Sequence, residues 1–168
     1  MKFKSILAKP FAGYVYKQIR RGMQTALDDQ EQIFKTLLKT GAKTVFGKDH
    51  RLGEVHDYAA FQQAVPIRDY EGIQGYIEQI KAGKHNVLWK GQPIYFAKTS
   101  GTTSGVKYIP ITRDSIPNHI QTARNALLYY MHSSGNTAFA EGKMIFLSGS
   151  PELERVGLLP DEPDRGQA

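Results

Sequence analysis

The chain has 168 residues, enough for one globular domain with a core but short for a large enzyme that handles two substrates. Hydrophobic residues make up 40% and charged residues 23%, a balance that excludes an intrinsically disordered chain. There is no cysteine, which excludes disulfide bridges, thiolate zinc sites and cysteine nucleophiles, and the reducing cytoplasm is the expected compartment.

The net charge of +6 is concentrated at the start of the chain. Residues 1–27 hold six basic residues and no acidic one, whereas 16 basic and 16 acidic residues balance in the remainder. Apolar residues recur there at roughly helical spacing: Phe3, Ile6, Leu7, Phe11, Tyr14, Val15 and Ile19. We expect a basic amphipathic helix over 1–27, with Pro10 as a point where it could be interrupted.

Two interpretations of this basic helix stay open. It could pack its apolar stripe on the domain while its basic face stays in water, or it could lie on a membrane surface. The sequence has no run of 18 apolar residues and no secretory signal, so neither a transmembrane segment nor export is predicted.

The first half of the chain after this helix is predicted to be helical. One helix is expected over 28–42, with Asp28 and Glu31 at the spacing of a capping box. Asp57 is positioned to cap a short helix that ends before Pro66. A third helix over 70–81 would place its apolar residues on one face: Ile73, Tyr76, Ile77 and Ile80.

The pattern changes after Gly83. Short runs at 86–89, 94–98 and 108–111 are predicted strands separated by Gly, Ser and Thr. Thr112 is a candidate cap for a long helix over 113–132, with Pro117 delaying its first regular turns, and a buried strand is expected over 144–147. Helices followed by strands that alternate with a long helix predict an α/β fold that is begun and not completed in this chain.

The run from Thr99 to Lys107 has a composition that suits the binding of an anion such as a phosphate group. Its glycines allow backbone N–H groups to converge on an anion, its hydroxyls add hydrogen bonds, and Lys107 adds positive charge. It is not a Walker A loop, because the spacing differs and a strand follows in place of a helix. From the residues alone, a polyphosphate site and an ordinary hairpin tip both fit.

A resemblance to a known family gives a more specific prediction for this loop than its composition does. The segment FAKTSGTTSGVKYIPIT at 96–112 resembles the phosphate-binding motif of the acyl-adenylating superfamily of acyl-CoA synthetases, peptide-synthetase adenylation domains and luciferases. It is most similar to auxin-responsive-type acyl-acid amido synthetases and their bacterial relatives. Flanking runs share the likeness, which covers roughly 30–156: TVFGKDH at 44–50, the segment 65–89, and ALLYYM at 126–131.

The resemblance implies that 28–156 is the N-terminal part of an acyl-adenylating domain and contains the start of the sheet of adenylate-forming enzymes. It implies a ligase that uses ATP with Mg²⁺ to adenylate a small carboxylic acid and then passes the acyl group to an amine or amino acid. No nucleic-acid partner is implied.

The resemblance also implies site residues. ATP phosphates would be held by Ser100, Gly101, Thr102, Thr103, Ser104, Gly105 and Lys107. The following helix would help to line an acyl pocket with His119, Ala123, Arg124 and Leu127, although an arginine on a long helix is more often simply solvated. The five histidines lack metal-ligand spacing, so no metal site of the protein itself is predicted, and no catalytic residue is identified.

Past Val156 the sequence departs from this family. Residues 157–168 are rich in Pro, Asp and Gly and are expected to be a disordered tail. We therefore expect an N-terminal fragment, from a truncated reading frame or a longer protein, that does not form an acyl adenylate by itself. Two alternatives remain: a non-catalytic nucleotide- or anion-binding module, and a membrane-surface binding protein that uses residues 1–27.

Overall fold

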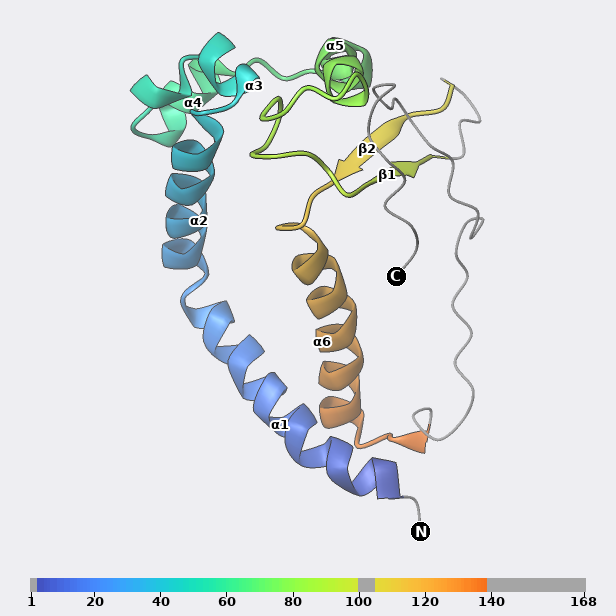
Figure 1. Cartoon of the computed structure of the whole chain (residues 1–168). Helices are drawn as coiled ribbons and strands as arrows, with labels where there is room; N and C mark the ends of the chain where they lie inside the picture. Colours follow the sequence, from blue (N-terminus) through green and yellow to red (C-terminus); the bar gives the residue numbers. More distant parts are fainter. Residues whose placement is uncertain (1–2, 100–104, 139–168) are drawn as a thin grey trace. The chain divides into compact units, whose positions relative to one another are not determined.

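A computed structural model of the protein describes residues 3–99 and 105–138, which are mostly helical with one small sheet (Figure 1). The elements are α1 (Phe3–Gln24), α2 (Ala26–Gly41), α3 (Val45–Asp49), the 3₁₀ turn η1 (Leu52–Glu54), α4 (Tyr58–Ala64), α5 (Tyr70–Lys81), β1 (Tyr95–Lys98), β2 (Tyr108–Ile111) and α6 (Ile116–Ser134). Of the described residues, 3–32 and 114–138 form one compact unit, unit 1, and 33–99 and 105–113 form another, unit 2.

In unit 1, α1 and α6 run alongside each other (Figure 1). Ala12 and Val15 of α1 are buried against Leu128 and Met131 of α6. Of the predicted apolar stripe, Val15 is buried and Ile19 packs against this cluster, whereas Phe11 and Tyr14 are exposed, so both interpretations of the basic helix stay open.

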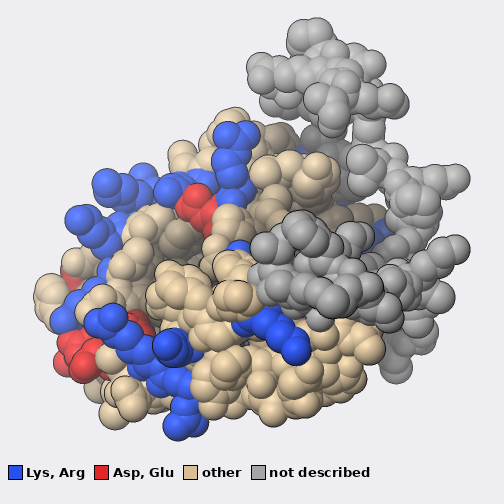
Figure 2. Space-filling model, turned by 90° about the horizontal axis from the view of Figure 1, so that it is seen from below, with Lys and Arg blue, Asp and Glu red and all other residues tan. Residues whose placement is uncertain are grey.

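The charged side of α1 stays in water. Its described basic side chains are all exposed: Lys9, Lys17, Arg20 and Arg21. On the face drawn in Figure 2, Lys and Arg side chains are widely spread and Asp and Glu side chains are few. Pro10 does not interrupt the helix; its ring lies on the exposed side, and a proline removes only one backbone donor.

The two long predicted helices begin at places other than those expected. α2 starts at Ala26, which puts Asp28 inside the first turn, where its charge still favours the positive end of the helix dipole. Asp28 is therefore not the cap, and Thr25 just before the helix donates its hydroxyl to Asp29 at 2.7 Å. α6 starts at Ile116 rather than after a Thr112 cap, because Pro117 is tolerated only in a first turn.

The shorter predicted helices in unit 2 are confirmed, as is the predicted Asp57 cap, and the structure adds a cap at Asp69 that was not predicted. The carboxylate of Asp57 accepts the amide of Ala60 at 2.8 Å at the start of α4. The carboxylate of Asp69 accepts the amide of Gly72 at 2.9 Å at the start of α5. Each side chain satisfies a backbone donor that would otherwise lack a partner in the helix.

Helix α3 was not predicted, and its first turn is held both by its own cap, Thr44, and by residues far along the chain. The hydroxyl of Thr44 accepts the amide of Gly47 at 2.9 Å and donates to the carbonyl of Gly41 at 2.7 Å. The amides of Val45 and Phe46 donate to the carbonyls of residues 86 and 87 at 2.8 and 3.0 Å.

The predicted strand over 86–89 is wrong. Asn86 has a positive φ of 55°, and its backbone and side chain bond Gly91 at 3.0 and 2.7 Å, which closes a loop. Val87 is 1% exposed because it belongs to a core cluster with Ile77 and Ile80 of α5. The apolar run over 86–89 therefore reflects the burial of Val87 in the core and not the presence of a strand.

The two strands form an antiparallel pair with Tyr95 opposite Ile111 and Lys98 opposite Tyr108, which confirms the predicted strands at 94–98 and 108–111. The α/β expectation is thus met in a coarser form, a mostly helical chain with a small antiparallel sheet. The predicted strand over 144–147 and the tail over 157–168 lie outside the described residues. Within 3–99 and 105–138, no helix has the length and apolar character that a membrane span requires.

Candidate phosphate-binding site

The candidate loop connects the two strands of the hairpin, and its base is closed by Thr99 and Lys107. The amide of Thr99 donates to the carbonyl of Lys107 at 3.1 Å, and the amide of Lys107 donates to the Thr99 hydroxyl at 3.2 Å. The strand, loop, strand arrangement is confirmed, and Thr99 anchors the end of β1. Residues 100–104, and with them Ser100, Gly101, Thr102, Thr103 and Ser104, lie outside the described residues.

Gly105, the first described loop residue after 100–104, has a φ of +78°. This left-handed backbone conformation is strained for any residue with a Cβ atom, although the space around Gly105 is open. Glycine is thus required here by the backbone path that leads from the loop into β2.

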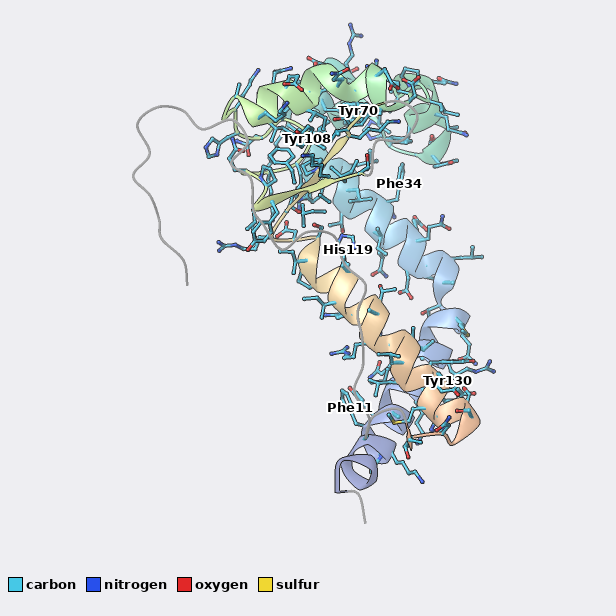
Figure 3. The ribbon with its side chains drawn as sticks, turned by 90° about the vertical axis from the view of Figure 1, so that its right-hand side faces the viewer. Phe11, Phe34, Tyr70, Tyr108, His119 and Tyr130 are labelled. Carbon is cyan, nitrogen blue, oxygen red and sulfur yellow. The ribbon has the colours of Figure 1, made fainter. Side chains whose placement is uncertain are left out.

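Lys107 contacts an aromatic ring of α5. Its Nζ atom lies 5.5 Å from the centroid of the Tyr70 ring, a cation–π contact. The hydroxyl of the same Tyr70 accepts the backbone amide of Tyr108 at 2.9 Å. Figure 3 shows the labelled Tyr70 and Tyr108 next to one another.

A second contact between α5 and the hairpin is made at the other end of the helix. The Nζ atom of Lys81 lies 4.7 Å from the Tyr108 ring centroid and donates to the Glu78 carboxylate at 2.9 and 3.0 Å. The Tyr108 ring meets Phe96 of β1 edge to face, with 6.3 Å between centroids. The C-terminal side of the loop is therefore fixed to α5 at both ends of that helix.

The residues expected in an acyl pocket lie on α6, in unit 1, whereas the hairpin belongs to unit 2. His119, Ala123 and Leu127 share one face of α6 by their spacing, and all are exposed. The guanidinium of Arg124 is exposed too and donates to the side chain of Asn125 at 3.3 and 3.2 Å. Their role stays a prediction.

A polar cluster in unit 2 was not predicted from the sequence. His50, 7% exposed, donates from Nδ1 to the carbonyl of Phe46 at 2.8 Å, and Arg68 donates to its Nε2 at 3.2 Å. The phenol of Tyr76 donates to the Asp49 carboxylate at 2.9 Å. Arg68 and His50 are 18 positions apart, and Tyr76 and Asp49 are 27 positions apart. Contacts at such separations leave no pattern in the sequence from which they could be predicted.

Tyr76 is the member of this cluster whose ionisation is shifted. Burial raises the pKa of its phenol above the usual 10.0, and the hydrogen bond and charge of Asp49 act in the same direction, while Arg68 opposes them.

An open cavity of about 430 Å³ beside the cluster is lined in part by Asp49, His50 and Glu54. In the part of the chain that the structure describes, no three His, Asp or Glu side chains are placed to share a metal ion.

A family model described as the GH3 family N-terminal domain matches residues 15–160, which is most of the chain. The chain belongs to the GH3 family. This confirms the resemblance to auxin-responsive-type amido synthetases, and the match includes the hairpin, its loop and α6.

Among curated relatives of this GH3 chain is the indole-3-acetic acid-amido synthetase GH3.5 of Arabidopsis thaliana, 27% identical over 141 residues, or 80% of this chain and 22% of the relative. The indole-3-acetic acid-amido synthetase GH3.8 of Oryza sativa subsp. indica is 30% identical over 102 residues, 60% of this chain and 16% of the relative. The chain thus spans about a fifth of the length of these relatives.

Proposed function

We propose that this GH3 chain supplies the ATP phosphate-binding part of an acyl-acid amido synthetase. Members of the GH3 family are ligases of this kind, use ATP and act on acids and amino acids. In this proposal residues 28–156 form the N-terminal part of the acyl-adenylating domain.

The reaction has two steps. A carboxylate oxygen of the acid attacks the α-phosphorus of ATP, the bond from that phosphorus to its bridging oxygen breaks, and pyrophosphate leaves. The nitrogen of an amine or amino acid then attacks the acyl carbon, AMP leaves, and the nitrogen loses a proton. The first step requires the leaving pyrophosphate to be held with its charge compensated.

The residues of the loop match that requirement. The hydroxyls of Ser100, Thr102, Thr103 and Ser104 and the amides of Gly101 and Gly105 would donate to the β- and γ-phosphate oxygens. Lys107 would compensate their charge, and Mg²⁺ would arrive bound to the ATP phosphates. His119, Ala123, Arg124 and Leu127 of α6 are proposed to help line the acyl pocket, on the family resemblance alone.

The observation that carries the proposal is the hairpin itself, in which a loop rich in Ser, Thr and Gly is closed at its base by Thr99 and Lys107 within the GH3 match. An ordinary hairpin tip could share the left-handed Gly105 and the hydroxyl-rich composition, so the family match over this segment and the presence of Lys107 two residues later are what favour a phosphate site.

Binding of magnesium pyrophosphate to the 168-residue chain, measured by isothermal titration calorimetry, tests the proposal. Ser100→Ala with Thr102→Val removes two hydroxyl donors and should weaken binding by about two to four orders of magnitude, since a hydrogen bond to a charged group contributes about 1.5–3 kcal/mol. Thr122→Val with Ser133→Ala makes the same chemical change on α6 and should leave the affinity as it was. Equal effects of the two pairs, or no binding by the unaltered chain, would contradict the proposal.

A further inference from the structure

We propose that Tyr70 is a positioning residue that holds Lys107 and the start of β2 for phosphate binding. The inference rests on the proposed function, because it concerns the lysine that follows the phosphate-binding loop. It adds a residue of α5, outside the loop motif, to the machinery of the site.

One side chain makes two contacts with consecutive residues of the hairpin. The face of the Tyr70 ring lies 5.5 Å from the ammonium of Lys107, and its hydroxyl accepts the amide of Tyr108 at 2.9 Å. The first contact restricts a side chain and the second restricts the backbone that carries it. Tyr70 thus acts on the position of Lys107 in two independent ways.

Tyr70 is itself well fixed. It is the first residue of α5, directly after the capping Asp69, and α5 buries Ile77 and Ile80 in the core of unit 2. Lys81 at the other end of the helix lies over the ring of Tyr108. The helix therefore provides a rigid base against which the residues after the loop are aligned.

This arrangement suits a lysine that binds phosphate. A lysine side chain is a flexible four-carbon stem with three N–H donors at its end, and holding it in place before the ligand arrives lowers the entropy lost on binding. An aromatic ring attracts the ammonium through its face and accepts no strong hydrogen bond, so the N–H groups stay available for phosphate oxygens. A carboxylate in the place of Tyr70 would instead compete with the phosphate.

A double-mutant cycle separates this role from a merely structural one. In the 168-residue chain, Tyr70→Leu should weaken magnesium pyrophosphate binding about tenfold, the size of coupling that contacting residues show. In a Lys107→Met background the same substitution should change the affinity by less than about twofold, because its effect runs through Lys107. Tyr70→Phe keeps the ring over Lys107 and loses only the hydroxyl that accepts the Tyr108 amide, so it should weaken binding less than Tyr70→Leu does.

Tyr58→Leu is the matched control, since Tyr58 is the first residue of α4 after the capping Asp57, as Tyr70 is for α5 after Asp69. It should leave pyrophosphate binding unchanged. If Tyr70→Leu weakened binding equally in the original chain and in the Lys107→Met background, Tyr70 would be a structural residue only and the inference would be overturned. Failure of the unaltered chain to bind pyrophosphate would instead reject the proposed function.

A measurement on the unaltered chain covers the case in which Tyr70→Leu does not fold. In the NMR spectrum, the ε-methylene protons of Lys107, assigned with the Lys107→Met variant, should be shifted upfield by the Tyr70 ring relative to those of the exposed Lys9 and Lys17. Shifts equal to those of exposed lysines would overturn the inference.

Discussion

Gly47 lies so close to Gly41 that a Cβ atom at position 47 would overlap the carbonyl oxygen of Gly41. The contact joins the start of α3 to the end of α2, beside the bonds that Thr44 makes to the same two residues. Backbone atoms on both sides cannot move aside in the way that a flexible side chain can.

Gly47→Ala should therefore destabilise unit 2 strongly, by more than about 3 kcal/mol, as other severe overpacking changes do. The free energy of unfolding in urea, followed by circular dichroism, checks this. Gly75→Ala is the control, because nothing lies within 4 Å of that position in α5 and alanine is the better helix former by about 0.5–1 kcal/mol. A Gly47→Ala variant as stable as the original chain would show that α2 and α3 can separate at little cost.

The caps of α4 and α5 offer a milder test. Asp57→Ala and Asp69→Ala each remove the acceptor of one backbone amide, of Ala60 and Gly72, and should cost about 1 kcal/mol. Asparagine in either place keeps an acceptor oxygen and should retain most of the stability. Chemical denaturation of the alanine and asparagine variants gives the comparison, and equal losses for the two would argue that charge rather than capping matters.

Leu127 and Leu128 are neighbours on α6 with different surroundings. Leu128 is 9% exposed in the cluster that joins α1 and α6, and Leu127 is 40% exposed. Leu128→Ala should lower stability by about 2–5 kcal/mol, whereas Leu127→Ala should change it by less than about 0.5 kcal/mol. Thermal unfolding of both variants tests this prediction. A larger loss of stability for Leu127→Ala than for Leu128→Ala would mean that the face of α6 that carries Leu127 is buried.

Stability should fall in alkaline solution through Tyr76. The folded chain holds the phenolic proton more tightly than the unfolded chain, because the pKa of Tyr76 is raised by burial and by Asp49. The contribution is thus complete below the usual pKa of 10.0 and is lost as the pH rises above that value. Tyr76→Phe has no proton to lose, so its unfolding free energy should fall less between about pH 9 and about pH 11. Parallel curves for the two chains would refute this.

The sequence predicted best the elements whose signals are local. The Asp57 cap located α4, helical apolar spacing located α5, and short apolar runs between Gly, Ser and Thr residues located the hairpin strands. The helix α3 was missed because it has only five residues and its first two amides are satisfied by residues 86 and 87, far along the chain. The strand over 86–89 was wrongly predicted because its apolar run is buried in a loop that Asn86 and Gly91 close.

In the candidate site, too, features with a local sequence signal were predicted and features that depend on distant contacts were not. The loop between Thr99 and Lys107 was recognised from its composition and family resemblance, since both are properties of a continuous segment. Tyr70 was not, because its partner Tyr108 is 38 residues away and a tyrosine at the start of a helix has no special pattern. The contacts of His50 with Arg68 and of Tyr76 with Asp49 were missed for the same reason.

The contact between Tyr70 and Tyr108 also affects whether a further strand can pair with the outer edge of β2. Alternate residues of a strand turn their amides to opposite sides, and the amide of Tyr108 turns away from β1 to the hydroxyl of Tyr70. The next amide position on that side of β2 belongs to Pro110, which has no N–H. A further strand at this edge of β2 would find no amide donor at either position, which disfavours strand pairing and association at this edge.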